Sequence, residues 1–224
     1  MSFKAHSPGS RCYAIMAIAV VLTNGCVNSS PQQNSEAELT QTVADQSDTT
    51  DRSDNSASLK VDVVVVNAAR DSTLLRKVMS EVKNIYQQCR IEFQFATRNT
   101  TLATEKTIDS ETRSMLAQQY KKALPTIFFV SRTAEADVAF AHLPSLDSPS
   151  ASTIWITERV NEGCLAWITA HEIGHVLLNN GKHSNGTGNV MSNGCTLSNW
   201  NNGAASPVWT TEQCSALHQS PSLK

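Results

Sequence analysis

The residues best suited to chemistry lie in one short stretch, residues 169–183, which contains the pattern His171-Glu172-Ile-Gly-His175. In an α-helix, residues four apart lie on the same face, so His171 and His175 can direct ring nitrogens at one Zn²⁺ ion, roughly 2.0–2.1 Å away. Glu172, one step round the helix from His171, is then close enough to take a proton from water activated by the metal. The pattern predicts a hydrolytic zinc site.

The third protein ligand can be sought by elimination. After His175 the chain contains no Asp, one Glu (Glu212) and two His (His183 and His218). Thr210 and Gln213 fit a capping box at the start of an expected last helix, and Glu212 falls in its first turn, where an acid is favourable without any metal. His218 lies further along that helix and is expected at the surface. His183 is therefore favoured, because it follows Gly181, which can turn the chain back towards the metal.

Together with Asn189-Val-Met191-Ser192, these residues resemble the metzincin clan of zinc metallopeptidases, whose pattern is H-E-x-x-H-x-x-G-x-x-H followed by a methionine turn. The resemblance covers about residues 153–214. It implies one catalytic Zn²⁺, a general base and acid, and a hydrophobic floor beneath the metal. The residues given these roles are the ligands His171, His175 and His183, the base Glu172, and the methionine Met191.

Two features depart from the clan pattern. The third histidine follows His175 by eight residues where the pattern has six, and the glycine is displaced from position 178, here Leu178, to Gly181. We therefore expect a helix over residues 164–180 that runs almost one turn longer than usual and ends with Gly181 in a left-handed conformation. No tyrosine follows Tyr120, so the extra tyrosine ligand of some metzincins is absent.

The first residues indicate where the protein works. Lys4 and Arg11 precede an apolar run over residues 12–22, which is typical of a signal peptide. The run ends at Cys26 in a sequence that resembles a bacterial lipobox, so we expect residues 1–26 to be a leader and Cys26 to be lipidated, with simple secretion as the alternative. Residues 27–58 are almost entirely small and polar, which predicts a disordered tether. The expected location is the bacterial cell envelope, as a periplasmic or surface lipoprotein, or outside the cell.

Charge and cysteine content limit the partners. The chain has 18 Lys and Arg against 20 Asp and Glu and shows no basic patch, which disfavours nucleic acid. Membrane contact is expected only through the lipid anchor, and the oligomeric state stays open. Four cysteines follow Cys26, and in an exported chain they predict two disulfides of unknown pairing. They are Cys89, Cys164, Cys195 and Cys214.

Residues 59–224 are long enough for one catalytic domain. Apolar runs and periodicities predict strands at 60–67, 91–95, 126–130 and Thr153–Thr157, with helices after Asp71, over 110–122 and at the C-terminus. This order of elements resembles that of the metzincin N-terminal subdomain, and the resemblance implies an α/β fold class of the zincin-like α+β kind. We expect a mixed twisted sheet with backing helices, an active-site helix, and a small C-terminal subdomain with the methionine turn and a last helix.

The same resemblance implies a peptide or protein substrate that adds a strand to the sheet edge above the active-site helix. Residues Thr153, Ile154, Trp155, Ile156 and Thr157 are assigned that role. The expected function is an exported zinc-dependent metalloendopeptidase. Two alternatives stay open: a non-catalytic binding module on the envelope, and a zinc amidase acting on cell-wall peptides. Glu172 argues against the first, because binding alone needs no general base.

Overall fold

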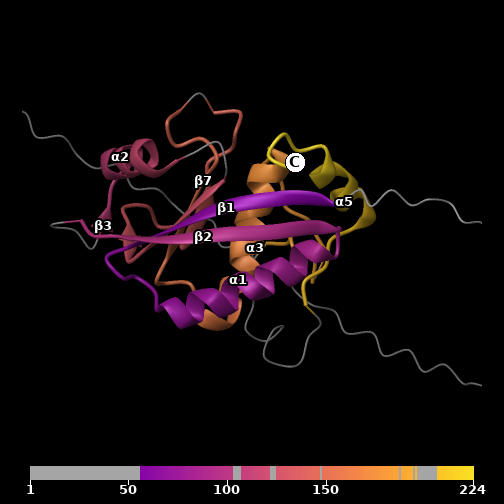
Figure 1. The fold of residues 1–224 in the computed structure, drawn as a ribbon, viewed down its shortest axis with the longest axis horizontal. Coiled ribbons are helices and arrows are strands. Elements are labelled where there is room, and N and C mark those ends of the chain that lie inside the picture. The colour runs from indigo at the N-terminus through magenta and orange to yellow at the C-terminus, as the bar shows by residue number, and fades with distance from the viewer. Residues whose placement is uncertain are drawn as a thin grey trace, which may run out of the picture. The chain divides into compact units, whose positions relative to one another are not determined.

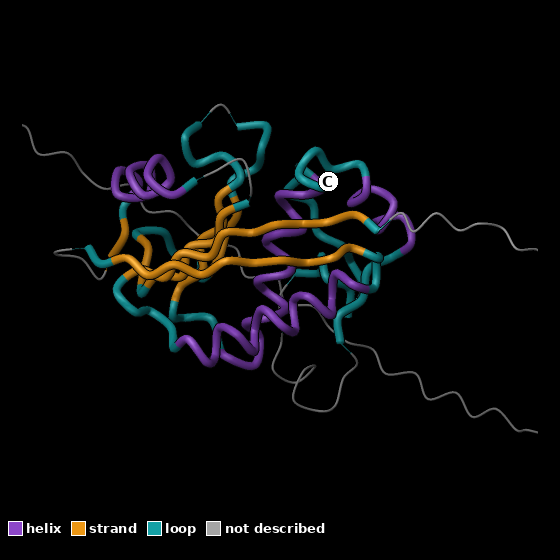
Figure 2. Tube along the Cα trace, viewed as in Figure 1, coloured by secondary structure: helices purple, strands orange, loops and turns teal. Residues whose placement is uncertain are grey.

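The computed structural model describes residues 56–102, 107–121, 125–146, 148–186, 188–193, 195 and 206–224. The expected leader with Cys26, and the expected tether up to residue 55, lie outside these residues. The elements in chain order are β1 (Ala57–Val66), α1 (Ser72–Gln87), β2 (Ile91–Thr100), β3 (Thr107–Ile108), α2 (Ser110–Tyr120), β4 (Thr126–Val130), β5 (Arg132–Thr133), β6 (Ala139–Ala141), β7 (Thr153–Thr157), α3 (Glu162–Leu178) and α5 (Thr211–His218) (Figures 1 and 2).

The central sheet has five strands in the order β2-β1-β4-β7-β6. The first four are parallel and β6 pairs antiparallel with β7, so the predicted mixed sheet is confirmed. The prediction that Thr153–Thr157 forms the sheet edge is wrong, because β6 lies outside it and all five residues of β7 are buried. The tether prediction also extended two residues too far: β1 starts at Ala57, and Ser58 pairs through its main chain with Lys224.

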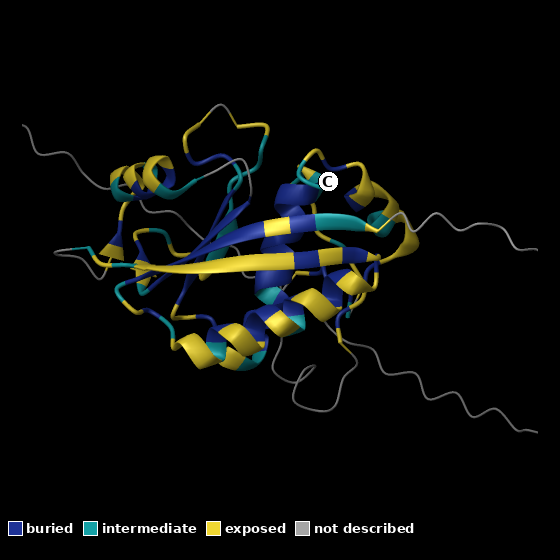
Figure 3. Ribbon diagram, in the orientation of Figure 1, coloured by how far each residue is buried: buried dark blue, intermediate teal, exposed yellow. Residues whose placement is uncertain are grey.

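Helices cover the two faces of the sheet. On one face, α1 and α3 enclose the larger core, which includes Val63, Val65, Met79 and Ile173. On the other face, α2 packs Leu116 into a smaller core with residues of β1, β4 and β7. Figure 3 shows α3 as a mostly buried helix behind the sheet. Helix α3, which carries His171 and His175, is therefore fixed along its length by apolar packing, since burial of large aliphatic side chains is the main favourable term in folding.

Helix ends follow local sequence signals. The Asp71 side chain accepts hydrogen bonds from the main-chain N–H groups of Thr73 and Leu74 and so caps α1, as the sequence predicts. Thr210 and Gln213 form a reciprocal capping box at the start of α5. The end of α3 differs from the prediction. The left-handed residue is Asn179, with φ of 48°, and Gly181 lies beyond it in the following loop.

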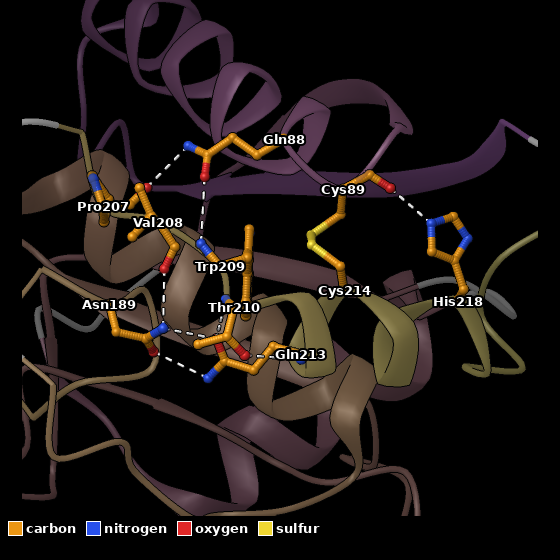
Figure 4. The surroundings of a disulfide bond; sticks show 10 residues. All are labelled: Gln88, Cys89, Asn189, Pro207, Val208, Trp209, Thr210, Gln213, Cys214 and His218. Carbon is orange, nitrogen blue, oxygen red and sulfur yellow. Dashed lines mark hydrogen bonds between the residues drawn. A yellow bond between two sulfur atoms is a disulfide. The ribbon is translucent and has the colours of Figure 1, made fainter. Parts of the chain in front are cut away.

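Two disulfides join distant parts of the chain. Cys89 pairs with Cys214, linking the region after α1 to α5 (Figure 4), and Cys164 pairs with Cys195, linking the first turn of α3 to the segment after the methionine turn. Disulfides persist in oxidising compartments, so both pairs are compatible with an exported protein. Among the described residues, none of the helices has the length and apolarity needed to cross a membrane.

We expect peptide mapping by mass spectrometry under non-reducing conditions to recover two cross-linked pairs, Cys89 with Cys214 and Cys164 with Cys195. Both pairs bring their Cα atoms within the 4.4–6.8 Å range of disulfides, at 5.1 and 5.7 Å. Alkylation before digestion should leave these four cysteines unmodified. Recovery of any other pairing among them would contradict the arrangement of α5 and the methionine turn described above.

Candidate metal centre

Three histidine side chains converge on one point beneath the sheet. The Nε2 atom of His175 lies 2.9 Å from Nε2 of His171 and 3.2 Å from Nε2 of His183. Ligand nitrogens bound to one tetrahedral zinc are separated by about 3.3 Å, because each is about 2.0–2.1 Å from the ion. Among the described residues, these three form the group whose ligand atoms all lie within 4.8 Å of one another. Their spacing fits one small metal ion.

Hydrogen bonds fix the tautomers of the two helical histidines. Nδ1 of His171 lies 2.8 Å from the carbonyl oxygen of Val190, and Nδ1 of His175 lies 2.8 Å from that of Asn180. A carbonyl oxygen can only accept, so each Nδ1 carries the proton and each Nε2 keeps a free lone pair. Such contacts to the remote ring nitrogen orient metal ligands and raise their basicity.

The protonation state also suits metal binding. Burial, together with the two neighbouring imidazoles, lowers the pKa of His171 to about 4, although the bond to Val190 opposes this shift. Burial and His183 likewise lower the pKa of His175. Both rings are therefore neutral at pH 7, which is the form that binds a metal.

Glu172 is buried beside the histidines and does not belong to the group of three ligands. Burial, with a smaller contribution from the charge of Asp137, raises the pKa of its carboxyl group to about 8. A raised carboxyl pKa in a cleft is common for general acids and bases, because the group can both accept and donate a proton near neutral pH. The side chain borders a cavity of about 140 Å³ that is also lined by His171, Trp167 and Ser192.

The methionine turn supports the histidines from below. The carbonyl oxygen of Val190 accepts hydrogen bonds from both His171 and the indole N–H of Trp167, which lies 3.0 Å away. Met191 is buried, and its sulfur packs so closely on Gly174 of α3 that a Cβ atom there would lie 2.6 Å from it. Only a glycine at position 174 lets the turn approach the helix this closely.

The turn is anchored in its own right. The side chain of Asn189 accepts from the main-chain N–H of Met191 and exchanges two hydrogen bonds, of 2.8 and 3.0 Å, with the side-chain amide of Gln213 (Figure 4). Gln213 is also the capping-box residue of α5, and the Cys89–Cys214 disulfide holds that helix. No motif in the sequence marks Asn189 or Gln213 as supports of the turn, because the two residues lie 24 positions apart.

His183 reaches the other two histidines through an extended loop. The helix ends at Leu178, so the extra residues between His175 and His183 lie in this loop, and the predicted extension of the helix to residue 180 is wrong. The loop is joined to the methionine turn, since the N–H of Ser184 donates to the carbonyl oxygen of Met191 at 2.7 Å. The longer spacing is thereby compatible with convergence of all three rings.

The other two residues considered as ligands lie elsewhere. The ring of His218 lies 2.7 Å from the carbonyl oxygen of Cys89, at the other end of α5 from Asn189 (Figure 4). Glu212 is exposed in the first turn of α5, where it borders a separate cavity of about 270 Å³ together with His183. Neither belongs to the cluster of possible ligands found among the described residues.

The edge strand β6 borders the cavity beside Glu172 through Ala139 and the preceding residue, Val138. Contacts from α2, on the other face of the sheet, hold β6 in place. Arg113 of α2 is buried, forms an ion pair with Glu135, and lies with its guanidinium carbon 5.4 Å from the centre of the Phe140 ring in β6. Cation–π contacts of this kind and the ion pair together fix the segment that leads into β6.

Comparison with known proteins shows similarity in structure and not in sequence. No protein-family model matches the chain, and no curated protein matches it. The fold is similar to that of metalloproteinase-II from Bacteroides fragilis, with a TM-score of 0.53 and 12% sequence identity over 73% of this chain and 53% of that one. A zinc-dependent peptidase from Methanocorpusculum labreanum (strain Z) has a TM-score of 0.47 and 13% identity, over 70% of this chain and 99% of that one.

The chain thus spans about half the length of the Bacteroides structure. At this identity the similarity establishes the fold, which this chain shares with that metalloproteinase. The predicted fold class is confirmed.

Replacement of Gly174 by Ala should destabilise the domain by about 1–3 kcal/mol, because the added methyl group would overlap Met191 and would lie 2.8 Å from Cη2 of Trp209. The matched control is Gly181→Ala, since a Cβ atom at position 181 has no neighbour within 4 Å. Urea unfolding of both variants measures the difference. An unaffected Gly174 variant would show that the methionine turn does not pack on the helix as described.

Proposed function

We propose that this chain is a zinc-dependent metallopeptidase that hydrolyses peptide bonds. The observation that carries the proposal is the convergence of three imidazole Nε2 atoms, with a buried carboxyl group next to them that is not part of the ligand group. Three neutral protein ligands that leave one position open are typical of catalytic zinc sites, whereas structural sites have four protein ligands. The zincin-like fold supports the same assignment.

In the proposed reaction, the metal and the protein side chains have different roles. A zinc ion held by His171, His175 and His183 would act as a Lewis acid towards the scissile carbonyl group and make water a stronger nucleophile at neutral pH. Glu172 takes the proton from the attacking water and then donates it to the nitrogen of the departing amine. Its raised pKa favours the second transfer, in which the carboxyl group gives up the proton that it has gained.

The substrate strand is assigned to β6 in place of β7. Val138 and His142 make main-chain hydrogen bonds with β7, at 3.0 and 2.8 Å. Because hydrogen bonding alternates along an antiparallel strand, Ala139 and Ala141 direct their N–H and C=O groups away from β7. A peptide that pairs with these free groups would run along the cavity beside Glu172. Main-chain pairing of this kind favours peptides over small molecules as substrates.

The site of action follows from the two disulfides and the sequence of the leader. We infer that the domain is exported and that Cys26 carries the lipid anchor, with secretion as the alternative. The Cys89–Cys214 and Cys164–Cys195 disulfides support an oxidising compartment. The separation of membrane fractions from wild-type and Cys26→Ser cells tests the anchor, because only the wild-type chain should sediment with membranes.

Replacement of Glu172 by Gln should leave zinc binding intact and lower kcat for peptide hydrolysis by about 10²–10⁴-fold, since general acid–base catalysis typically contributes this much. The measurements are the zinc content of the purified protein and its turnover of a peptide library. Gln is close in size to Glu, so the cavity should keep its shape.

Two outcomes would overturn the assignment in different ways. Undiminished hydrolysis in the Glu172→Gln variant would remove the proposed base. A wild-type protein that is loaded with zinc, fully disulfide-bonded and inactive on all peptides would favour a binding module. Release of cell-wall fragments without cleavage of unstructured protein would instead indicate an amidase.

A further inference from the structure

The second edge of the sheet is formed by β2, whose outer side has no strand partner among the described residues. β2 has ten residues, and from Gln94 to Asn99 all of its residues are exposed (Figure 3). Among the described residues, β1 is the only strand that pairs with it in the five-stranded sheet. Natural proteins usually cover, shorten or interrupt such an edge, because its free N–H and C=O groups can bind another strand.

The backbone of β2 shows which groups are free. The carbonyl oxygen of Thr100 accepts a hydrogen bond of 2.9 Å from the N–H of Asn67, just after β1. Since successive residues of a strand alternate in direction, the even-numbered residues of β2 pair with β1 and the odd-numbered ones face outward. The outward-facing main-chain groups therefore belong to the odd-numbered residues, which are Ile91, Phe93, Phe95, Thr97 and Asn99.

The side chains of β2 are complementary to those of an antiparallel copy. The strand contains one acid, Glu92, and one base, Arg98, placed symmetrically about Phe95. Arg98 lies 3.7 Å from Asp62 of β1, and its side chain is still exposed enough to reach a second acid. If two copies pair with Phe95 opposite Phe95, then each Glu92 lies directly across from Arg98 of the other copy. In the same register the outward-facing residues meet as hydrogen-bonded pairs, Phe93 with Thr97 and Phe95 with itself.

Phe95 adds an apolar contact at the centre of this arrangement. Its side chain is 38% exposed, and its ring packs 6.4 Å from that of Phe93, which belongs to the core. Pairing across a two-fold axis would cover both copies of Phe95. We propose that β2 is a dimerisation edge, through which two copies of this chain join their sheets about a two-fold axis at Phe95. Such an interface uses the same surface on both partners, as most homodimers do.

The charge pattern gives a sharp test on the purified full chain. Sedimentation velocity should show a dimer for the wild type. The variants Glu92→Arg and Arg98→Glu each place like charges across both contacts, and each should weaken self-association by about tenfold or more. A 1:1 mixture of the two variants should associate again, because one then carries two bases and the other two acids. Glu111→Arg, a matched charge change at an exposed position of α2, should not affect the dimer.

Each result decides for or against the proposal. A wild-type chain that sediments as a monomer at every concentration would overturn it, as would single variants that associate as strongly as the wild type. Circular dichroism identifies a single variant that has not folded. The double variant Glu92→Arg/Arg98→Glu then serves as the test: it exchanges the two charges within one chain, restores opposite charges across both contacts, and should dimerise. Failure of both this double variant and the mixture would also overturn the register. None of these measurements depends on peptidase activity.

Discussion

The carbonyl oxygen of Val190 is the contact on which the site most depends. It accepts one hydrogen bond from His171 and one from Trp167, so the methionine turn sets both the tautomer of a ligand and the position of a cavity wall. The free lone pair on Nε2 follows from this bond, because the proton is held on the other nitrogen. A small shift of the turn would change both the position of the His171 ring and the shape of the cavity. Several contacts hold the turn in place.

Those contacts come from segments distant in the sequence. Gly174 lets Met191 pack on α3, Asn189 joins the turn to Gln213 at the start of α5, and the Cys89–Cys214 disulfide ties α5 to the region after α1. Tyr86 of α1 donates a buried hydrogen bond to the carbonyl oxygen of Ala170, one residue before the first ligand. Contacts with the methionine turn, with α1 and with the C-terminal segment thus fix α3, so the positions of His171 and His175 are set before a metal binds.

Structural features that depend on residues close together in the sequence could be predicted, whereas features that depend on tertiary packing could not. The histidine spacing, the Asp71 cap and the capping box at Thr210 depend on residues within one or two turns, and the structure agrees with each. The edge strand β6 was missed, since Ala139–Ala141 is too short to show a period of two and is fixed by Arg113 from another helix. The left-handed residue that follows α3 is Asn179 where glycine was expected, because an asparagine also adopts the left-handed conformation. The pairing of four cysteines has no sequence signature at all.

We propose that His171, His175 and His183 hold one zinc ion despite the long spacing to the third ligand. Zinc-edge X-ray absorption on the purified chain, with zinc content measured alongside, tests this binding. We expect about one zinc per chain with three imidazole nitrogens at about 2.0–2.1 Å and no sulfur ligand. We also expect loss of one imidazole and much weaker binding in His183→Ala, with an unchanged spectrum in His218→Ala. Sulfur at about 2.3 Å, or a His183→Ala variant with wild-type affinity and spectrum, would contradict it.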